Sequence, residues 1–319
     1  MIRWAAAAIV LAFLVRAVSA SAIIDAIGAT HPAWAAAAFA LTLLSQFVVA
    51  ARLKLLSNAY ELGPSLPALF RINLAALFYG MFLPAGNVTA AAVRYYRIAR
   101  PNEEYSGGAI AIVLDRLAAT ASLCAVGVAA WLLADPGTGR AALVVMAGSL
   151  AVLLLAVAAL LGGRATGGIE WLARRLPPRF ALARAAARSR ELSGATLWGV
   201  AALSLLAHLI GVLGYQALAV ALGLELSLLT VAWIRSAAML AAMLPVAIAG
   251  LGVRDAALLA LLAPYGVPGG QALAFSLSVF AWTIAAVGLL GGILEALGLV
   301  SGRVAARADR NPKGHVRHL

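Results

Sequence analysis

Long apolar stretches separated by short polar loops run along most of this chain. Six stretches are long enough to cross a bilayer as single helices, because a span needs about 20 apolar residues. They cover residues 4–27, 33–56, 106–134, 140–162, 195–222 and 269–299. Gly288, Gly291 and Gly292 in the last stretch predict a close contact between two helices. The pattern predicts an all-α polytopic membrane protein with about six full spans.

Two further apolar segments, about 66–99 and 227–264, are interrupted by Leu-Pro followed by small residues. The breaks read Leu83-Pro84-Ala85-Gly86-Asn87-Val88-Thr89 before Val93-Arg94, and Leu244-Pro245-Val246-Ala247-Ile248-Ala249-Gly250-Leu251-Gly252 before Val253-Arg254-Asp255. Neither segment supplies two good spans, since arginines crowd the end of the first and only about 12 residues follow the second break. Interrupted segments at corresponding places in two halves indicate a transporter binding site.

The basic residues of the loops predict the orientation. We assume a cytoplasmic N-terminus and let each broken segment enter and leave the membrane on the same side. Of the loops then on the outer side, only one carries a basic residue, Arg140. Counting 66–83 as a full span would place the basic loop 164–190 outside. We therefore expect two oppositely oriented re-entrant segments, as in an inverted repeat. The basic residues assigned to the cytoplasmic side are Arg3, Arg52, Lys54, Arg94, Arg97, Arg100, Arg164, Arg174, Arg175, Arg179, Arg184, Arg188, Arg190, Arg303, Arg307, Arg310, Lys313 and Arg317.

The chain is predicted to form one transmembrane domain, residues 1–302, followed by a basic cytoplasmic tail, 303–319. Its repeat-like halves are about 33–134 and 195–299. The basic loop 163–194 between them is either an element that binds anionic lipid at the interface or a loop that only sets the topology.

Residues 1–22 are interpreted as a retained first helix, because apolar character continues to Ile27. The alternative is a cleaved signal peptide ending near Ala20-Ser21-Ala22. In either case we expect a multi-pass protein of the inner (plasma) membrane, with the retained N-terminus and the C-terminus in the cytoplasm.

Composition supports a membrane protein and excludes several classes of site. The chain is 64% hydrophobic and 11% charged, too apolar for the surface of a soluble protein of 319 residues. Its net charge of +12 does not indicate nucleic-acid binding, because the basic residues lie in particular loops. The single Cys124 excludes an intramolecular disulfide, and the four histidines show no ligand spacing. We expect a buried free thiol at Cys124, no metal and no other cofactor.

Several arginines fall within apolar segments, where a central charge costs about 2.5–3.5 kcal/mol and needs a cavity or a partner. Arg16, Arg71 and Arg235 are expected to snorkel to a membrane surface. Two others stand beside an acid, in Asp115-Arg116 and Arg254-Asp255.

Adjacent side chains on a helix point apart, so each member of these two pairs is expected to find its partner on another helix. Asp115 lies about 15 Å along its helix, near the membrane midplane. We interpret Asp115, Arg116 and Asp255 as ion-pair partners that switch during transport. The alternative for Asp115 and Arg116 is a fixed structural link between helices.

The second break predicts an anion site. Arg254 follows Gly250 and Gly252 at the start of a half-helix beyond Pro245. Unpaired N–H groups and the positive end of the helix dipole favour negative charge there. The arginine supplies further N–H donors and a full positive charge. The alternative is that Pro and Gly only allow helices to kink and pack closely.

The first break resembles the second in pattern but differs in spacing. Beyond Pro84, Asn87 and Thr89 are expected to cap the new helix. Arg94 follows about 10 Å farther along it. Together the two breaks predict a cavity for a headgroup phosphate.

Four motifs resemble the lysylphosphatidylglycerol synthase transmembrane-domain family over nearly the whole chain. They are Phe78-Tyr79-Gly80-Met81-Phe82-Leu83-Pro84, Val93-Arg94, Leu114-Asp115-Arg116, and Leu244-Pro245 through Gly250-Leu251-Gly252-Val253-Arg254-Asp255. The family includes the membrane part of the multiple peptide resistance factor, which moves aminoacylated lipid between leaflets. Members usually have an acidic residue shortly before the first arginine, where this chain has Thr89-Ala90-Ala91-Ala92. Relatives beside glycosyltransferases or in lipid pathways imply a possible partner enzyme.

We therefore expect a flippase-like lipid translocase that binds an anionic phospholipid or glycolipid headgroup between the two broken helices. No catalytic constellation is found, because carboxylates are sparse and no Ser/His/Asp spacing or phosphate loop occurs. The alternatives are a lipid-modifying glycosyl or aminoacyl transferase, or the non-catalytic membrane subunit of such an enzyme. Altered lipid in cells expressing the chain alone would favour the transferase, and activity only with a co-purified partner would favour the subunit.

Overall fold

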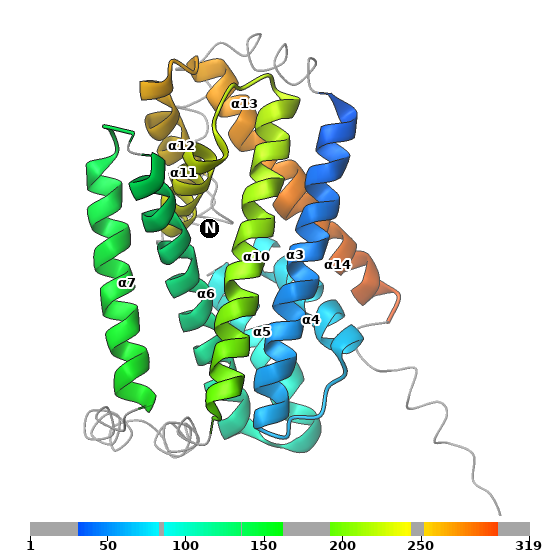
Figure 1. Ribbon diagram of the computed structural model, residues 1–319. Coiled ribbons are helices and arrows are strands. Elements are labelled where there is room, and N and C mark those ends of the chain that lie inside the picture. The colour runs from blue at the N-terminus through cyan, green and yellow to red at the C-terminus, as the bar shows by residue number, and fades with distance from the viewer. Residues whose placement is uncertain (1–30, 83–85, 135, 162–191, 244–251, 299–319) are drawn as a thin grey trace, which may run out of the picture.

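The computed structural model describes residues 31–82, 86–134, 136–161, 192–243 and 252–298 (Figure 1). All regular secondary structure in these residues is helical. Five helical segments in them are long and apolar enough to cross a membrane. These are α3 (Pro32–Ala59), α6 (Tyr105–Ala134), α7 (Arg140–Leu161), α10 (Gly194–Ala221) and the continuous run Gly269–Ala296. They lie close to five of the predicted spans, whereas the predicted span 4–27 falls outside the described residues.

The run Gly269–Ala296 is not a uniform α-helix. It consists of α13 (Gly269–Val279), the π-helical segment η4 (Phe280–Ala285) and α14 (Ala286–Ala296). A π-helical turn widens a helix locally and is frequent at functional sites.

Each broken segment forms two short helices. The first contains α4 (Leu66–Phe82) and α5 (Asn87–Ala99), followed by the 3-10 turn η1 (Arg100–Asn102). The second contains α11 (Leu228–Ala241) and α12 (Val253–Leu262), followed by the 3-10 turn η3 (Ala263–Tyr265). These four helices have 17, 13, 14 and 10 residues, each shorter than the roughly 20 that a span requires. Within each segment the two helices pack against each other.

Residues 32–134 and 194–296 contain the same order of elements, which is a long helix, two short helices and a second long helical run (Figure 1). α3 and α10 each have 28 residues and lie antiparallel, since His31 N–H donates to Ala221 O at 3.1 Å and Ser45 Oγ to Ala207 O at 3.0 Å. In Figure 1, α4 and α5 occupy the lower part of the bundle, and α11 and α12 occupy the upper part. The two short-helix pairs therefore start from opposite ends.

The glycine-rich face of α14 fits directly against α4. A Cβ atom at Gly291 would collide with the backbone carbonyl of Leu74, and one at Gly292 would collide with the ring of Phe78. Gly288 faces Met81 at ordinary contact distance. The close helix contact predicted for these three glycines is therefore present.

Helix α7 shows why this bundle requires an apolar solvent. Only Met146 of its residues is buried, although the helix is almost wholly apolar. Val144, Val152 and Leu155 are 69%, 66% and 70% exposed. A continuous apolar surface of this kind is favourable in lipid and unfavourable in water. The chain is therefore a multi-pass membrane protein.

Opposite entry of the two helix pairs predicts opposite labelling of the loops that lead into them. A cysteine replacing exposed Ser65, before α4, should react with a membrane-impermeant maleimide from one side of a sealed vesicle. A cysteine replacing exposed Glu225, before α11, should react only from the other side. The native Cys124 is free and buried, so wild-type protein provides the low-labelling control. Labelling of both positions from one side would contradict the inverted arrangement.

The contact between α14 and α4 predicts a large effect of a single methyl group. Gly291→Ala should lower the free energy of unfolding in detergent by about 1–3 kcal/mol or more, because the new Cβ forces α4 and α14 apart. The matched control is Gly148→Ala on α7, where an added Cβ meets no atom within 4 Å. That variant should be neutral or stabilised by up to about 1 kcal/mol. Equal melting temperatures for the two variants would contradict this account.

Candidate functional site

A buried ion-pair network joins α3, α6 and α10. Asp115 of α6 is 0% exposed and accepts hydrogen bonds from Arg52 of α3, with Nε 2.8 Å and Nη2 2.7 Å from its Oδ1. Arg52 Nη1 also donates to Ser204 Oγ of α10 at 3.1 Å. Ser204 in turn donates to Val200 O at 2.6 Å. Since every connection is buried, this network fixes the relative positions of three long helices.

Two sequence predictions about this network are wrong. Arg52 was placed with the cytoplasmic loop residues, yet it lies inside α3 and is 1% exposed. Arg116 was expected to point away from Asp115, but its Nε and Nη2 donate to Asp115 Oδ2 at 3.1 and 2.6 Å. Divergence of adjacent Cβ atoms does not prevent this bond, because the long arginine side chain can fold back over its neighbour.

Arg94 of α5 lies beside this network without joining it. Its side chain interacts electrostatically with Arg116, Asp115 and Arg52, and the residue is 4% exposed. Its Nε is buried without a hydrogen-bond partner, and it forms no ion pair with any described residue. Two neighbouring arginines already form the ion pairs with Asp115, and Arg94 forms none with the described residues.

The start of α12 forms a second buried cluster. Gly252 is its N-cap and has φ +86°, a conformation that favours glycine. Asp255 Oδ2 accepts from the Gly252 N–H at 2.8 Å, and its Oδ1 accepts from Ser276 Oγ of α13 at 2.5 Å. This carboxylate therefore caps α12 and connects it to α13.

Arg254 lies in the same cluster, and not all of its N–H donors are used by the described residues. Its Nη2 donates to Asp255 Oδ1 at 2.8 Å and to Ser276 O at 3.3 Å. Its buried Nε and Nη1 have no partner among the described residues, and its Cζ lies 5.9 Å from the ring centroid of Phe280 in the π-helical segment. The ion pair between Arg254 and Asp255 again overturns the expectation that adjacent members point apart.

The structure describes only some of the residues of the site predicted at the first break. The N-cap of α5 is Gly86, with φ +44°, whereas Asn87 is the first helical residue and is exposed. The prediction that Asn87 caps this helix is therefore wrong. Glycine took the position because its positive φ is accessible at little cost without a Cβ. Pro84, Pro245 and Gly250 lie outside the described residues.

Arg235 is a further buried cation that sequence analysis assigned to the membrane surface. It is 6% exposed, and its Cζ lies 5.2 Å from the ring centroid of Tyr215. A Cβ at Gly211 would collide with its guanidinium, so that glycine provides the space for it. Within the part of the chain that the structure describes, its buried Nε and Nη1 have no hydrogen-bond partner. Arg235 therefore does not snorkel, because a slot and an aromatic ring on α10 hold it inside the bundle.

The sequence contains a signal for the buried position of Arg235 but none for that of Arg52. Arg52 precedes the end of its apolar stretch by about one turn, which only a helix extended to Ala59 reveals as interior. Gly211 and Tyr215 are four residues apart on one helix face, a spacing that offers space and a ring to the same cation.

The described interior holds more positive than negative charge. Its buried charged residues are Arg52, Arg94, Arg235 and Arg254 against Asp115 and Asp255. Arg94 and Arg254 do not contact each other, since each interacts within its own half. Buried charges without counter-charges are costly in a medium of low dielectric constant. An anion that reached these arginines would relieve that cost.

Comparison with known proteins identifies the family. A family model described as "Lysylphosphatidylglycerol synthase TM region" matches residues 1–291, and the chain belongs to this family. The resemblance found in the sequence motifs is thereby confirmed. No curated protein matches the chain.

The network around Asp115 predicts a strong dependence on its charge. Asp115→Asn should lower the free energy of unfolding by about 3–5 kcal/mol, because it leaves Arg52 buried without a counter-charge. Glu295→Gln is the control, since it breaks an ion pair with Arg97 whose side chains are each 19% exposed. That loss should be about 1 kcal/mol or less. Denaturation in detergent would measure both, and similar values would show that Asp115 does not stabilise the bundle as described.

Proposed function

We propose that this member of the lysylphosphatidylglycerol synthase transmembrane family moves a lipid with an anionic headgroup between membrane leaflets. The headgroup phosphate, of a phospholipid or a phosphate-bearing glycolipid, would bind to arginines at the two broken segments. One observation carries the proposal: buried guanidinium N–H groups of Arg94 and Arg254 have no partner among the described residues. Phosphate oxygens are suitable acceptors for such donors.

Of the two proposed phosphate-binding arginines, Arg254 would bind more strongly. Its side chain is 0% exposed and stands in the first turn of α12, where the helix dipole also favours an anion. Its unpartnered Nε and Nη1 lie on different edges of the guanidinium, and each can donate to a phosphate oxygen. Arg94 would serve the opposite side, because α5 belongs to the helix pair that starts from the other end of the bundle (Figure 1).

The hydrogen bonds around the two aspartates favour exchange of partners. If Arg254 turns to a phosphate, Asp255 keeps its bonds from Ser276 Oγ and the Gly252 N–H. If Arg116 leaves, Asp115 keeps its two contacts with Arg52. Arg116 is 41% exposed, whereas Arg52 is 1% exposed, so Arg116 is the partner that can move. We infer that Asp115, Arg116 and Asp255 act as switchable ion pairs while Arg52 stays fixed.

Alternating access would follow from the inverted order of the helices. We infer that residues 66–99 and 227–264 are re-entrant segments of an inverted repeat, with the loop before α4 in the cytoplasm. Such repeats allow one half of a transporter to rock against the other around a central site. We also infer a plasma-membrane location and an enzyme that supplies the lipid, for which a membrane glycosyltransferase or another lipid-synthesis enzyme would serve.

Leaflet exchange in proteoliposomes tests the function directly. Labelled phosphatidylglycerol should cross in a protein-dependent manner, and Arg254→Gln and Arg94→Gln should each reduce the rate at least about tenfold, as expected for a lost bond between charged groups. Arg140→Gln is the control, because this arginine is exposed at the start of α7. A labelled uncharged glycolipid should cross little in any variant.

The possible outcomes separate the proposal from its rivals. Exchange that persists in both arginine variants would contradict the proposed binding site but still support lipid translocation. Absence of exchange for every lipid would contradict translocation. Chemically altered lipid in cells expressing the chain would then favour a lipid-modifying enzyme.

A further inference from the structure

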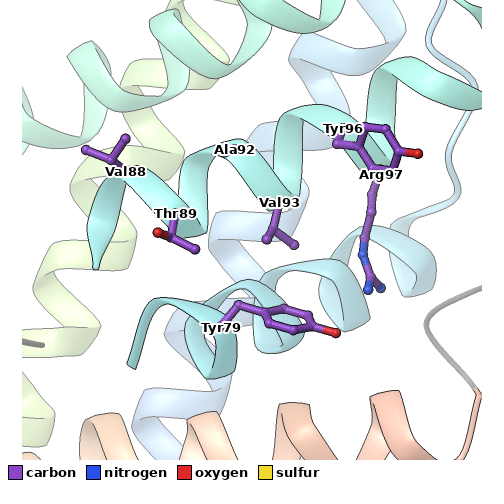
Figure 2. Close-up of a pocket in the computed structure, with 7 residues that line it drawn as sticks. All are labelled: Tyr79, Val88, Thr89, Ala92, Val93, Tyr96 and Arg97. Atoms are coloured by element: carbon purple, nitrogen blue, oxygen red, sulfur yellow. The ribbon is translucent and has the colours of Figure 1, made fainter. Parts of the chain in front are cut away.

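A groove between α4 and α5 lies apart from the buried arginine clusters. It has a volume of about 460 Å³ and is bounded by Tyr79 of α4 and by the face of α5 that runs from Val88 to Arg97 (Figure 2). This volume falls within the range of small-molecule sites, roughly 300–1,000 Å³. Helices α4 and α5 approach closely at one end of the pair, where a Cβ at Gly80 would meet Gly86 O at 3.0 Å.

The residues of α5 along the groove follow helical spacing. Val88, Ala92 and Tyr96 form one row, and Thr89, Val93 and Arg97 form the row beside it (Figure 2). Residues four apart lie on the same face of a helix, so the groove follows α5 for about 13 Å. Val88 is 70% exposed and Tyr96 is 51% exposed, which leaves the groove open along its side.

Polarity changes along the groove. The end at Val88 is apolar and belongs to the start of α5, whereas Arg97 lies in its last turn. Arg97 Nη1 and Nη2 donate to Glu295 of α14 at 2.9 and 2.7 Å, and its Cζ lies 5.8 Å from the ring centroid of Tyr79. A guanidinium has five N–H donors, so these two bonds leave it able to bind a phosphate. Arg100, 5.2 Å from the ring centroid of Tyr96, adds positive charge at the same end.

This distribution matches a membrane phospholipid. A phospholipid places its phosphate at the interface and its acyl chains toward the membrane centre, and Arg97 and Val88 are ordered in that way along α5. Arg94 lies on the other side of α5, buried and interacting with Arg116 and Asp115. Helix α5 thus separates the groove from the central cluster.

We propose that this groove is a docking site for a phospholipid, with one acyl chain along Val88, Ala92 and Val93 and the phosphate at Arg97. This site goes beyond the proposed translocation, because a lipid can occupy it whether or not the protein moves lipid between leaflets. If translocation occurs, the groove would hold a lipid at the end of the bundle from which α4 starts.

Photo-cross-linking of the full chain tests this site. The protein is placed in phosphatidylcholine nanodiscs with a trace of phosphatidylglycerol that carries a diazirine midway along one acyl chain. After illumination, mass spectrometry should find at least fivefold more lipid per residue on α4 and α5 than on lipid-facing α7. Ala92→Trp, at an exposed position, should fill the groove and lower its cross-linking at least fivefold. Ala151→Trp, exposed on α7, is the matched control and should leave groove cross-linking unchanged.

A second pair of variants tests the phosphate contact. Arg97→Gln should reduce groove cross-linking of the phosphatidylglycerol probe about tenfold, but not that of a diacylglycerol probe with the same acyl chains. Glu295→Gln breaks the same ion pair but retains Arg97, and should keep or increase the phosphatidylglycerol signal. Equal losses in both variants would show that the ion pair is only structural and would overturn the phosphate assignment.

Cross-linking spread evenly over α5 and α7, and unaffected by Ala92→Trp, would contradict the proposal that a phospholipid docks in the groove. These outcomes do not depend on leaflet exchange. Failure of the docking site is therefore distinguishable from failure of the translocase.

Discussion

The carboxylate of Asp115 is the charge on which the arrangement of the long helices depends. It lies in an apolar interior, where an ion is tolerated only if its bonding capacity is met. Arg52 of α3 and Arg116 supply that capacity, and Ser204 of α10 takes up the remaining donor of Arg52. Since α3, α6 and α10 converge on this one group, the helix pairs α4–α5 and α11–α12 are held against a fixed framework.

Among the described buried charges, the arginines outside this framework are less completely satisfied than the two aspartates. Asp115 has more donors than it requires, and Asp255 is bound by a serine and a backbone N–H as well as by Arg254. Both aspartates can thus lose one arginine and remain bonded. Donors of Arg94, Arg235 and Arg254 have no partner among the described residues, and the described interior holds more buried positive than negative charge. Both features favour an anion. Under the proposed translocation, the additional bonds of the two aspartates would let an arginine exchange partners while Arg52 and Ser204 hold α3, α6 and α10 together.

Hydrophobic runs were sufficient to predict most of the fold. Span length alone located α3, α6, α7 and α10, and the Leu-Pro breaks separated α4 from α5 and α11 from α12. Side-chain partners were not predictable in the same way, because an arginine reaches far beyond the direction of its Cβ. Arg52 and Arg235 therefore appeared to belong to the membrane surface, although one completes the Asp115 network and the other stacks on Tyr215. The π-helical segment beside Arg254 has no simple sequence signal.

The position of residues 89–92 on α5 gives a physical reason why this chain lacks the acid that the family resemblance implies there. The family resemblance implies an acid shortly before the first arginine, where this chain has Thr89-Ala90-Ala91-Ala92. Thr89 and Ala92 of this stretch line the groove, on the same side of α5 as Arg97. A carboxylate at Ala92 would face the apolar path of an acyl chain and would lie five residues from Arg97, where it would weaken attraction of a phosphate. Small and mostly apolar residues there leave the basic residues of the groove at one end, as the proposed docking of a phospholipid requires.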